Sequence, residues 1–180
     1  MPEILVLDSC VLIDLIQGIK SVSSHIDPLI EKSKRAEVLL VFSSASRAEI
    51  MYLKEMAAKG LSQHEQTDLI CGWLNQDYLT ERLVDREIGD TAAELRRHVG
   101  TRMEKKILTP IDSIVLATAK SVSASVLVTN DNGSGGKKDG NGNRPVGMLE
   151  LDGFFGPEFP RIRKPENIPG QSDFSYEPKS

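Results

Sequence analysis

The sequence predicts an α/β fold of three layers (α/β/α), with a central, mostly parallel sheet between two layers of helices. Three uninterrupted apolar runs, at residues 4–7, 38–42 and 126–128, are typical of strands buried on both faces. Segments with the length and pattern of helices separate these runs, so strands and helices alternate along the chain. At 180 residues, the chain is long enough for one domain with an ordinary core.

The first half of the chain predicts four helices, two after each of the first two strands. Behind the first strand, the apolar run Val11–Ile16 predicts a helix that turns back over the sheet. Residues 21–35 predict a second helix, and residues 44–58, after the second strand, predict a third. Ser62 and Glu65 have the spacing of a capping box, which predicts the start of a fourth helix. The side chains expected on its buried side are Leu69, Ile70, Trp73 and Leu74.

The second half continues the alternation. Leu79–Val84 fits a short strand, and Asp85 then caps a helix that we expect to end at Gly100. Thr109-Pro110 begins another helix, with the proline at the first position, where its missing N–H costs nothing. After the third apolar strand, residues 146–151 predict a last edge strand.

Two segments interrupt this pattern. Residues 132–143 are rich in glycine and asparagine, which is the composition of a loop. From residue 156 onward prolines recur, so this part is expected to be an extended tail. We therefore predict one α/β domain over residues 1–155 and a proline-rich tail over 156–180.

Composition limits the classes of protein to which the chain can belong. The formal net charge is −4, which provides no overall field to attract nucleic acid. No apolar run approaches the roughly 20 residues that a membrane span needs, so no membrane partner is expected. The two cysteines, Cys10 and Cys71, lack the spacing of a metal or redox motif. These features together indicate a protein of the reducing cytoplasm.

Four acids are expected at one edge of the sheet. Asp8 follows the first strand directly, and Asp131 follows the third. Glu49 lies in the first turns of the helix after the second strand, and Asp112 lies in the first turn of a helix that runs antiparallel to the sheet. Because parallel strands all end at the same edge, these four carboxylates should meet where open α/β sheets bind their ligands.

Such a group of acids has a chemical interpretation and a structural one. Ionised carboxylates at close range repel one another unless cations lie between them, and oxygen ligands without His or Cys select Mg²⁺ or Mn²⁺. A site of this kind suits hydrolysis of a phosphodiester bond. Each acid also has an ordinary local explanation: Asp8, Glu49 and Asp112 could cap helices, and Asp131 could form a turn.

A basic segment is the candidate for contact with a polyanion. It contains Arg96, Arg97, Arg102, Lys105 and Lys106, with Glu104 among them. Arg97, Arg102 and Lys105 are its candidate RNA-binding residues. The alternative is that the segment is the solvated face of a helix, which is the commoner explanation of such a run.

Four segments resemble the PIN-domain ribonucleases, and most closely the toxin of VapBC toxin–antitoxin pairs. In sequence order they are Ile4-Leu5-Val6-Leu7-Asp8-Ser9-Cys10-Val11-Leu12-Ile13-Asp14, Ser44 to Glu49, Thr109-Pro110-Ile111-Asp112-Ser113-Ile114-Val115-Leu116-Ala117-Thr118-Ala119 and Leu127-Val128-Thr129-Asn130-Asp131.

The resemblance implies a PIN-like α/β/α fold and Mg²⁺- or Mn²⁺-dependent endoribonuclease activity on single-stranded or loop RNA. It places the acidic catalytic and metal site on Asp8, Glu49, Asp112 and Asp131, and Ser9, Thr129 and Asn130 would support that site. Members of the family commonly form homodimers and bind an antitoxin, so these are the expected protein partners.

One departure and two alternatives stand beside this interpretation. The family often has a second acid two residues beyond Asp131, where this chain has Gly133, and Asp139 is a candidate substitute. The main alternative is a PIN-fold module with little catalysis that binds RNA or protein. A phosphatase of the haloacid-dehalogenase type also begins with a strand and an Asp. That chemistry requires a second Asp two residues on, where Cys10 stands, so we exclude it.

Overall fold

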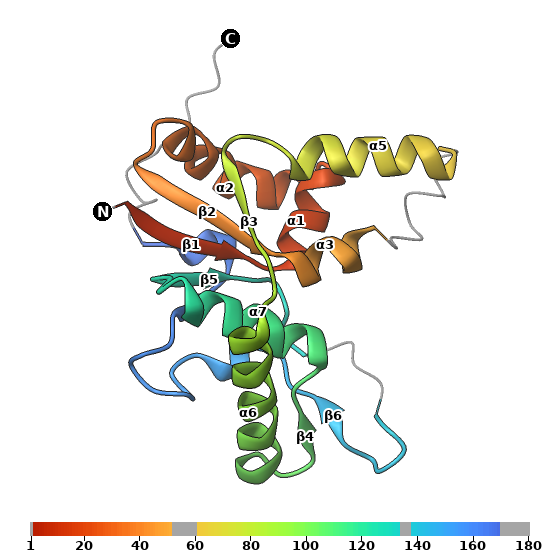
Figure 1. Cartoon of the computed structure of the whole chain (residues 1–180), viewed down its shortest axis with the longest axis vertical. Coiled ribbons are helices and arrows are strands. Elements are labelled where there is room, and N and C mark those ends of the chain that lie inside the picture. The colour runs from red at the N-terminus through yellow and green to blue at the C-terminus, as the bar shows by residue number, and fades with distance from the viewer. Residues whose placement is uncertain (1, 52–60, 134–137, 170–180) are drawn as a thin grey trace.

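The computed structural model describes residues 2–51, 61–133 and 138–169, and these form the predicted α/β/α arrangement (Figure 1). The central sheet is parallel and has the strand order β3-β2-β1-β5-β7. Its strands are β1 (Glu3–Leu7), β2 (Val38–Ser43), β3 (Leu79–Arg82), β5 (Val126–Val128) and β7 (Arg161–Arg163). The three apolar runs of the sequence therefore form the three central strands, as predicted.

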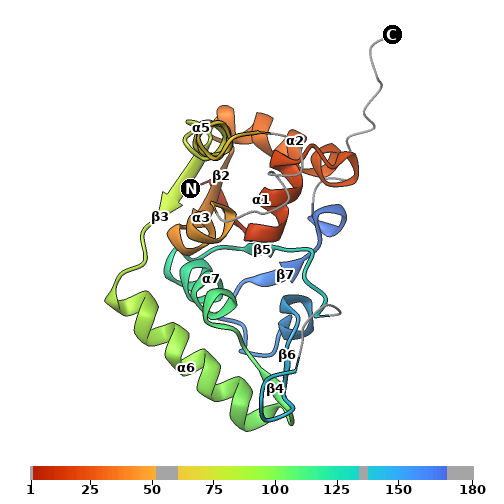
Figure 2. The same cartoon turned by 90° about the vertical axis from the view of Figure 1, so that its right-hand side faces the viewer.

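The strands are apolar throughout because each face of the sheet is covered by its own core. Alternate residues point to opposite faces, so Leu5 and Leu7 belong to one core and Val6 to the other. The first core packs against α1 (Ser9–Ile16), α2 (Lys20–Lys34) and α5 (Gln63–Leu74). The second packs against α6 (Arg86–Arg102) and α7 (Pro110–Ser121), and Figure 2 shows the sheet between the two layers.

The helices begin where the sequence places their caps. The Ser62–Glu65 capping box is present at the start of α5, and Asp85 accepts a hydrogen bond from Ile88 N at the start of α6. Thr109 caps α7, with Pro110 at its first position. Because each cap satisfies backbone N–H groups that have no partner inside the helix, its residue type can be recognised in the sequence.

Two predicted helix ends and one predicted buried residue differ from the structure. The helix that we expected over 44–58 is observed as α3 (Ser44–Ile50), and residues 52–60 lie outside the described residues. Helix α6 continues past Gly100 to Arg102, because an exposed glycine is tolerated inside a helix whose neighbour Val99 is fully buried. Leu69 was predicted to be buried but is 44% exposed, since α5 packs on Ile70 and Leu74, four residues apart.

The edge of the sheet is formed by a different segment from the one predicted. Residues 146–151 do not form a strand; they contain the 3-10 helix η1 (Met148–Leu151). The edge strand is β7, which lies inside the predicted tail and pairs with β5. Ile162 is its buried side chain, and Asp152 Oδ1 accepts a hydrogen bond of 2.9 Å from Ile162 N. The central sheet therefore includes residues 161–163, which the sequence had assigned to the tail.

A second, smaller sheet consists of two short strands. It pairs β4 (Lys106–Ile107) with β6 (Arg144–Pro145) in parallel, beside the end of α6 (Figure 1). Strand β4 is followed by the start of α7, and β6 is followed by η1. Among the described residues, no helix has both the length and the apolar character to cross a lipid bilayer.

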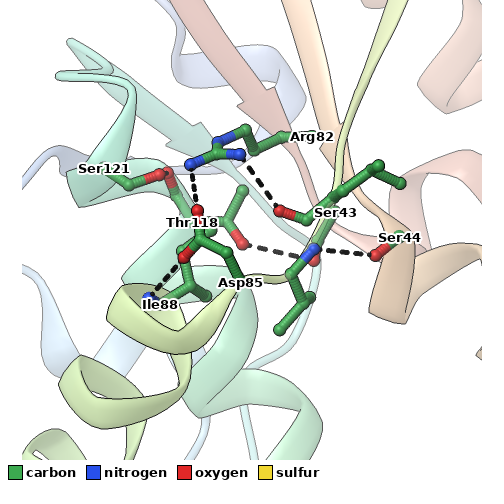
Figure 3. A network of polar contacts seen from close by, with 9 residues as sticks. Ser43, Ser44, Arg82, Asp85, Ile88, Thr118 and Ser121 are labelled. Carbon is green, nitrogen blue, oxygen red and sulfur yellow. Dashed lines mark hydrogen bonds and ion pairs between the residues drawn. The ribbon is translucent and has the colours of Figure 1, made fainter.

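Helix α7 is fixed against the end of β2 by buried polar groups. Thr118 and Ser43 are both fully buried, and Thr118 Oγ1 donates to Ser43 Oγ at 3.2 Å (Figure 3). Ser43 Oγ also caps α3 by accepting from Ala45 N. Next to this pair, Ser44 Oγ accepts from Val84 N, which joins the start of α3 to the segment that leads into α6. Ser43 therefore ties the start of α3 to the second half of α7 at the end of β2.

The role of β7 in the fold can be tested by truncating its buried side chain. Ile162→Ala should lower the free energy of unfolding by about 2–5 kcal/mol, as expected for a large apolar side chain lost from a core. The exposed neighbour Asn167→Ala is the control and should change stability by less than about 0.5 kcal/mol. Urea denaturation of the full chain measures both, and equal stabilities would show that residues 161–163 are not part of the folded core.

Candidate active site

The candidate site lies at the carboxyl edge of the two central strands β1 and β5. Asp8 follows β1, and Thr129, Asn130 and Asp131 follow β5. The strands remain paired up to this point, since Asp8 N donates to Val128 O at 3.0 Å. The side chains after β1 and β5 are therefore adjacent in space although they are more than 115 residues apart in sequence.

Asp8 is buried and fully hydrogen-bonded. It is 3% exposed, and its Oδ1 accepts from Ser9 N at 2.7 Å and from Ser9 Oγ at 3.3 Å. Its Oδ2 accepts from Thr129 Oγ1 at 2.7 Å and from Cys10 Sγ at 3.3 Å. Burial raises the pKa of Asp8, these hydrogen bonds oppose the rise, and the charge of Asp131 adds to it.

Thr129 connects the two acids that follow the central strands. Its hydroxyl donates to Asp8 Oδ2 and accepts from Asp131 N at 3.0 Å. The side chain is fully buried, so neither contact competes with water. One hydroxyl thus fixes the orientation of the Asp8 carboxylate and the backbone of Asp131 together.

Asp131 uses its carboxylate to hold the surrounding backbone. Its Oδ1 accepts from Gly133 N at 2.9 Å, which is an Asx turn, and its Oδ2 accepts from Met148 N at 2.9 Å. Its carbonyl oxygen accepts from Leu149 N at 3.1 Å. The structural interpretation of Asp131 as a turn residue is therefore true in this structure, and the side chain also contributes its charge to the site.

Asp112 shows the electrostatic grouping of the four acids. It sits in the first turn of α7, where Thr109 Oγ1 donates to its Oδ2 and accepts from its backbone N. The pKa of Asp112 is raised to about 6, first by burial and then by the negative charges of Asp8, Asp131 and Glu49. The structure thus places Asp8, Asp131 and Glu49 within electrostatic reach of Asp112.

Glu49 approaches the group from α3, and its side chain is exposed. The helix is anchored two residues earlier by Arg47, whose guanidinium pairs with Glu81 at 2.8 Å and donates to Asn75 Oδ1 at 2.9 Å. Arg47 therefore ties α3 to β3 and to the end of α5. Glu49 is the one acid of the four that lies on the surface.

Cys10 and Asp14 contact residues around the acids but had not been assigned to the site from the sequence. Cys10 Sγ lies 3.4 Å from Thr129 Oγ1 and accepts from Asn130 N at 3.2 Å, and burial raises the pKa of its thiol. Asn130 Nδ2 donates to Asp14 Oδ2 at 2.8 Å, so Asn130 supports the site by linking it to α1. The sequence could have indicated them, because Cys10 and Asp14 lie four residues apart on one face of the helix that Asp8 caps.

The acids match a hard cation in chemistry, although they are not arranged around one. All four offer only carboxylate oxygens, the ligands that Mg²⁺ and Mn²⁺ prefer. Within residues 2–51, 61–133 and 138–169, however, no three His, Cys, Asp or Glu side chains converge closely enough to hold a metal ion. The raised pKa of Asp112 shows that the site favours neutralisation of its charge, by a proton or by a cation.

The basic segment divides into two kinds of residue. Arg97, Arg102 and Lys105 are exposed, and Lys105 Nζ lies 3.9 Å from a carboxylate oxygen of Glu104. Arg96 Nε instead donates to Leu108 O at 3.2 Å, and Lys106 pairs with Glu150 at 3.0 Å. The three candidate RNA-binding residues are therefore available on the surface, and the other two make contacts within the fold.

The crowding of charge predicts a pH-dependent gain in stability for Asp112→Asn. Because the pKa of Asp112 is raised in the folded protein, its contribution is intact below about pH 4 and is lost as the pH rises to about 6. The metal-free variant should therefore be more stable than wild type at pH 7.5 and similar at pH 4. The expected gain is on the order of 1–2 kcal/mol, because one pKa unit is worth about 1.4 kcal/mol and partial exposure screens it.

Urea denaturation with a metal chelator, at both pH values, measures this difference. The amide of Asn still accepts a hydrogen bond from Thr109, so the cap of α7 is preserved. A variant less stable than wild type at pH 7.5 would mean that Asp112 acts as a helix cap whose charge costs nothing.

Comparison with solved structures identifies the same fold in toxin–antitoxin complexes. A chain of VapBC2 from Rickettsia felis, crystallised with a DNA fragment from their promoter, is 15% identical, with a TM-score of 0.60 over 89% of this chain and 98% of that one. A chain of DNA-bound VapBC from Salmonella typhimurium is 18% identical, with a TM-score of 0.59 over 92% and 99%. At these identities the likeness is one of fold.

A search of curated protein sequences finds no significant match. The family model described as "PIN domain" matches residues 5–134, which is more than half of the chain. That range contains Asp8, Glu49, Asp112 and Asp131, the acids that the fold brings together. The chain therefore belongs to the PIN domain family.

Proposed function

We propose that the protein is a Mg²⁺- or Mn²⁺-dependent endoribonuclease that cleaves single-stranded or loop RNA. The observation that carries the proposal is the electrostatic coupling of the four acids. Asp112 has a pKa of about 6 because it is buried near the charges of Asp8, Asp131 and Glu49. A fold gains no stability from such repulsion, so a site that retains it is better explained by a cationic ligand.

In this proposal, Asp8, Glu49, Asp112 and Asp131 hold the cation. When bound, a divalent cation supplies an activated water and stabilises negative charge on the phosphate. The protein's own hydrogen bonds orient the ligands: Thr129 and Ser9 hold the Asp8 carboxylate in one orientation, and Asn130 links the segment after β5 to α1. The buried hydroxyl and amide groups thus pre-arrange the acids that the cation would bind.

Substrate selection follows from the position of the acids on an open sheet edge. A flexible RNA strand can bring its backbone to such an edge, whereas the phosphates of a regular helix are less adaptable. The net charge of −4 means that RNA must be held by a local basic surface. We assign Arg97, Arg102 and Lys105 to that surface, since they are exposed.

We further propose a role as the toxin of a toxin–antitoxin pair that acts in the cytoplasm and forms homodimers. The structures of similar fold from Rickettsia felis and Salmonella typhimurium are both VapBC complexes, and this supports an antitoxin as the protein partner. The alternative is a PIN-fold module that binds RNA or protein with little catalysis. Both carboxylate oxygens of Asp131 already accept backbone hydrogen bonds, which favours this alternative. The negative charges that act on Asp112 oppose it.

Catalysis and cation binding can be tested with Asp8→Asn. The amide keeps the size of Asp8 and an acceptor for Ser9 N, and the Thr129 hydroxyl can reverse to accept from it. Wild type should melt at a higher temperature with millimolar Mn²⁺ and should cleave a single-stranded RNA, and the variant should lose both properties. The loss of cleavage should exceed about 100-fold, the equivalent of several kcal/mol of transition-state stabilisation.

Variant and wild type must be purified in parallel, since a contaminating nuclease would cleave equally in both. Equal cleavage rates, or a wild type that neither cleaves RNA nor responds to Mn²⁺, would contradict the nuclease proposal and favour the binding module.

The basic surface should act on binding rather than on chemistry. Arg102→Ala with Lys105→Ala should raise KM for RNA several-fold and leave kcat nearly unchanged. The effect on KM should be smaller at higher salt, because a protein with fewer phosphate contacts has a shallower salt dependence. The matched control is Lys20→Ala with Arg86→Ala, which removes the same charge from exposed positions outside this surface. If both pairs of substitutions raise KM equally, only the net charge matters and the assigned surface is wrong.

A further inference from the structure

Asp131 is held in place by a segment that comes from the second, smaller sheet. Strand β6 leads through Gly147 into η1, and the first residues of η1 supply both Met148 N to Asp131 Oδ2 and Leu149 N to Asp131 O. The position of this turn therefore determines two of the three backbone hydrogen bonds that Asp131 accepts. What fixes the turn also fixes the acid.

Two glycines leave the turn almost no freedom relative to Asp131. A Cβ at Gly147 would lie 2.3 Å from the backbone N of Gly133 and 2.3 Å from the backbone C of Asn132. Gly133 has φ +72°, and a Cβ there would lie 2.7 Å from Gly147 N. The two backbones are thus in direct contact, so a displacement of the turn is transmitted to residues 131–133.

Glu150 is the residue that secures the turn. Its Oε1 accepts from Gly147 N at 3.1 Å, and its carboxylate receives Lys106 Nζ at 3.0 and 3.1 Å. The pKa of Glu150 is lowered, first by the Gly147 N–H and then by Lys106. Both charged side chains are about one-third exposed, so the pair is only partly screened by water.

We infer that Lys106 and Glu150 are positioning residues for Asp131. Lys106 belongs to β4, which leads into α7 and Asp112, and Glu150 closes the turn after β6, which binds Asp131. Their ion pair therefore joins the segment that leads into Asp112 to the turn that holds Asp131. Lys106 lies in the basic segment, yet its ammonium is used within the fold, in contrast to the exposed Lys105 beside it.

This inference rests on the proposed function for its catalytic readout, and cation binding gives an independent one. Glu150→Ala and Lys106→Met should each raise the Mn²⁺ concentration that produces half of the melting-temperature increase by about tenfold, as for residues that orient ligands from behind. On single-stranded RNA, both should lower kcat by a similar factor and leave KM nearly unchanged, because Asp131 is displaced while the exposed basic surface stays intact.

Three further variants separate positioning from general destabilisation. Lys106→Arg should keep near-wild-type values, and the charge exchange Lys106→Glu with Glu150→Lys should recover part of the loss. Glu31→Ala and Lys34→Met break a surface ion pair of 2.7 Å on α2 and are the matched controls, which should leave the Mn²⁺ midpoint unchanged. Glu150→Gln keeps an acceptor for Gly147 N, so it should fold even if Glu150→Ala does not.

The outcomes distinguish the inference from the proposed function. If wild type responds to Mn²⁺ and cleaves RNA while the Glu150 and Lys106 variants match it in midpoint and kcat, the inference is wrong and the proposed function stands. The same conclusion follows if the α2 controls shift the midpoint as much as Lys106→Met does. A wild type without a Mn²⁺ response or cleavage would refute both.

Discussion

The hydroxyl of Thr129 is the contact on which the site depends. It lies between the carboxylate of Asp8 and the backbone N–H of Asp131, at the ends of two paired strands, and it is shielded from water. A buried hydrogen bond to a carboxylate is strong because no solvent competes with it. Since β1 and β5 are adjacent in the sheet, one hydroxyl is enough to set the relative positions of two acids from opposite ends of the domain.

The hydrogen bonds that the acids accept stabilise the fold, whereas the grouping of their charges in the proposed cation site disfavours it. Asp8, Asp112 and Asp131 each accept backbone or cap hydrogen bonds that stabilise the edge of the sheet. The pKa of Asp112 is raised first by burial and then by the negative charges of the other acids, so the site disfavours its charged form. Hydrogen bonds therefore keep the acids in place when no cation is bound.

The part of the chain after β5 has more influence on the site than its composition suggests. It forms the turn that binds Asp131, the second strand of the small sheet and the edge strand β7. Asp152 contributes by accepting from Ile162 N and pairing with Arg163 at 2.6 Å, so an acid outside the site holds the edge strand. The edge of the sheet that carries the acids is thus built from both halves of the domain, with β1 and β5 at its centre.

The sequence alone determined the three central strands, the caps of α5, α6 and α7, and the positions of Asp8 and Asp131 directly after two of those strands. These features are local, because an apolar run, a cap residue and the direction of a parallel strand are all read within a few residues. Only the tertiary structure decided that Arg161–Arg163 would form the edge strand and that Leu69 would face solvent, since packing partners distant in sequence make those choices. The same holds for Cys10 and for the Lys106–Glu150 pair, which join residues that no periodic pattern relates.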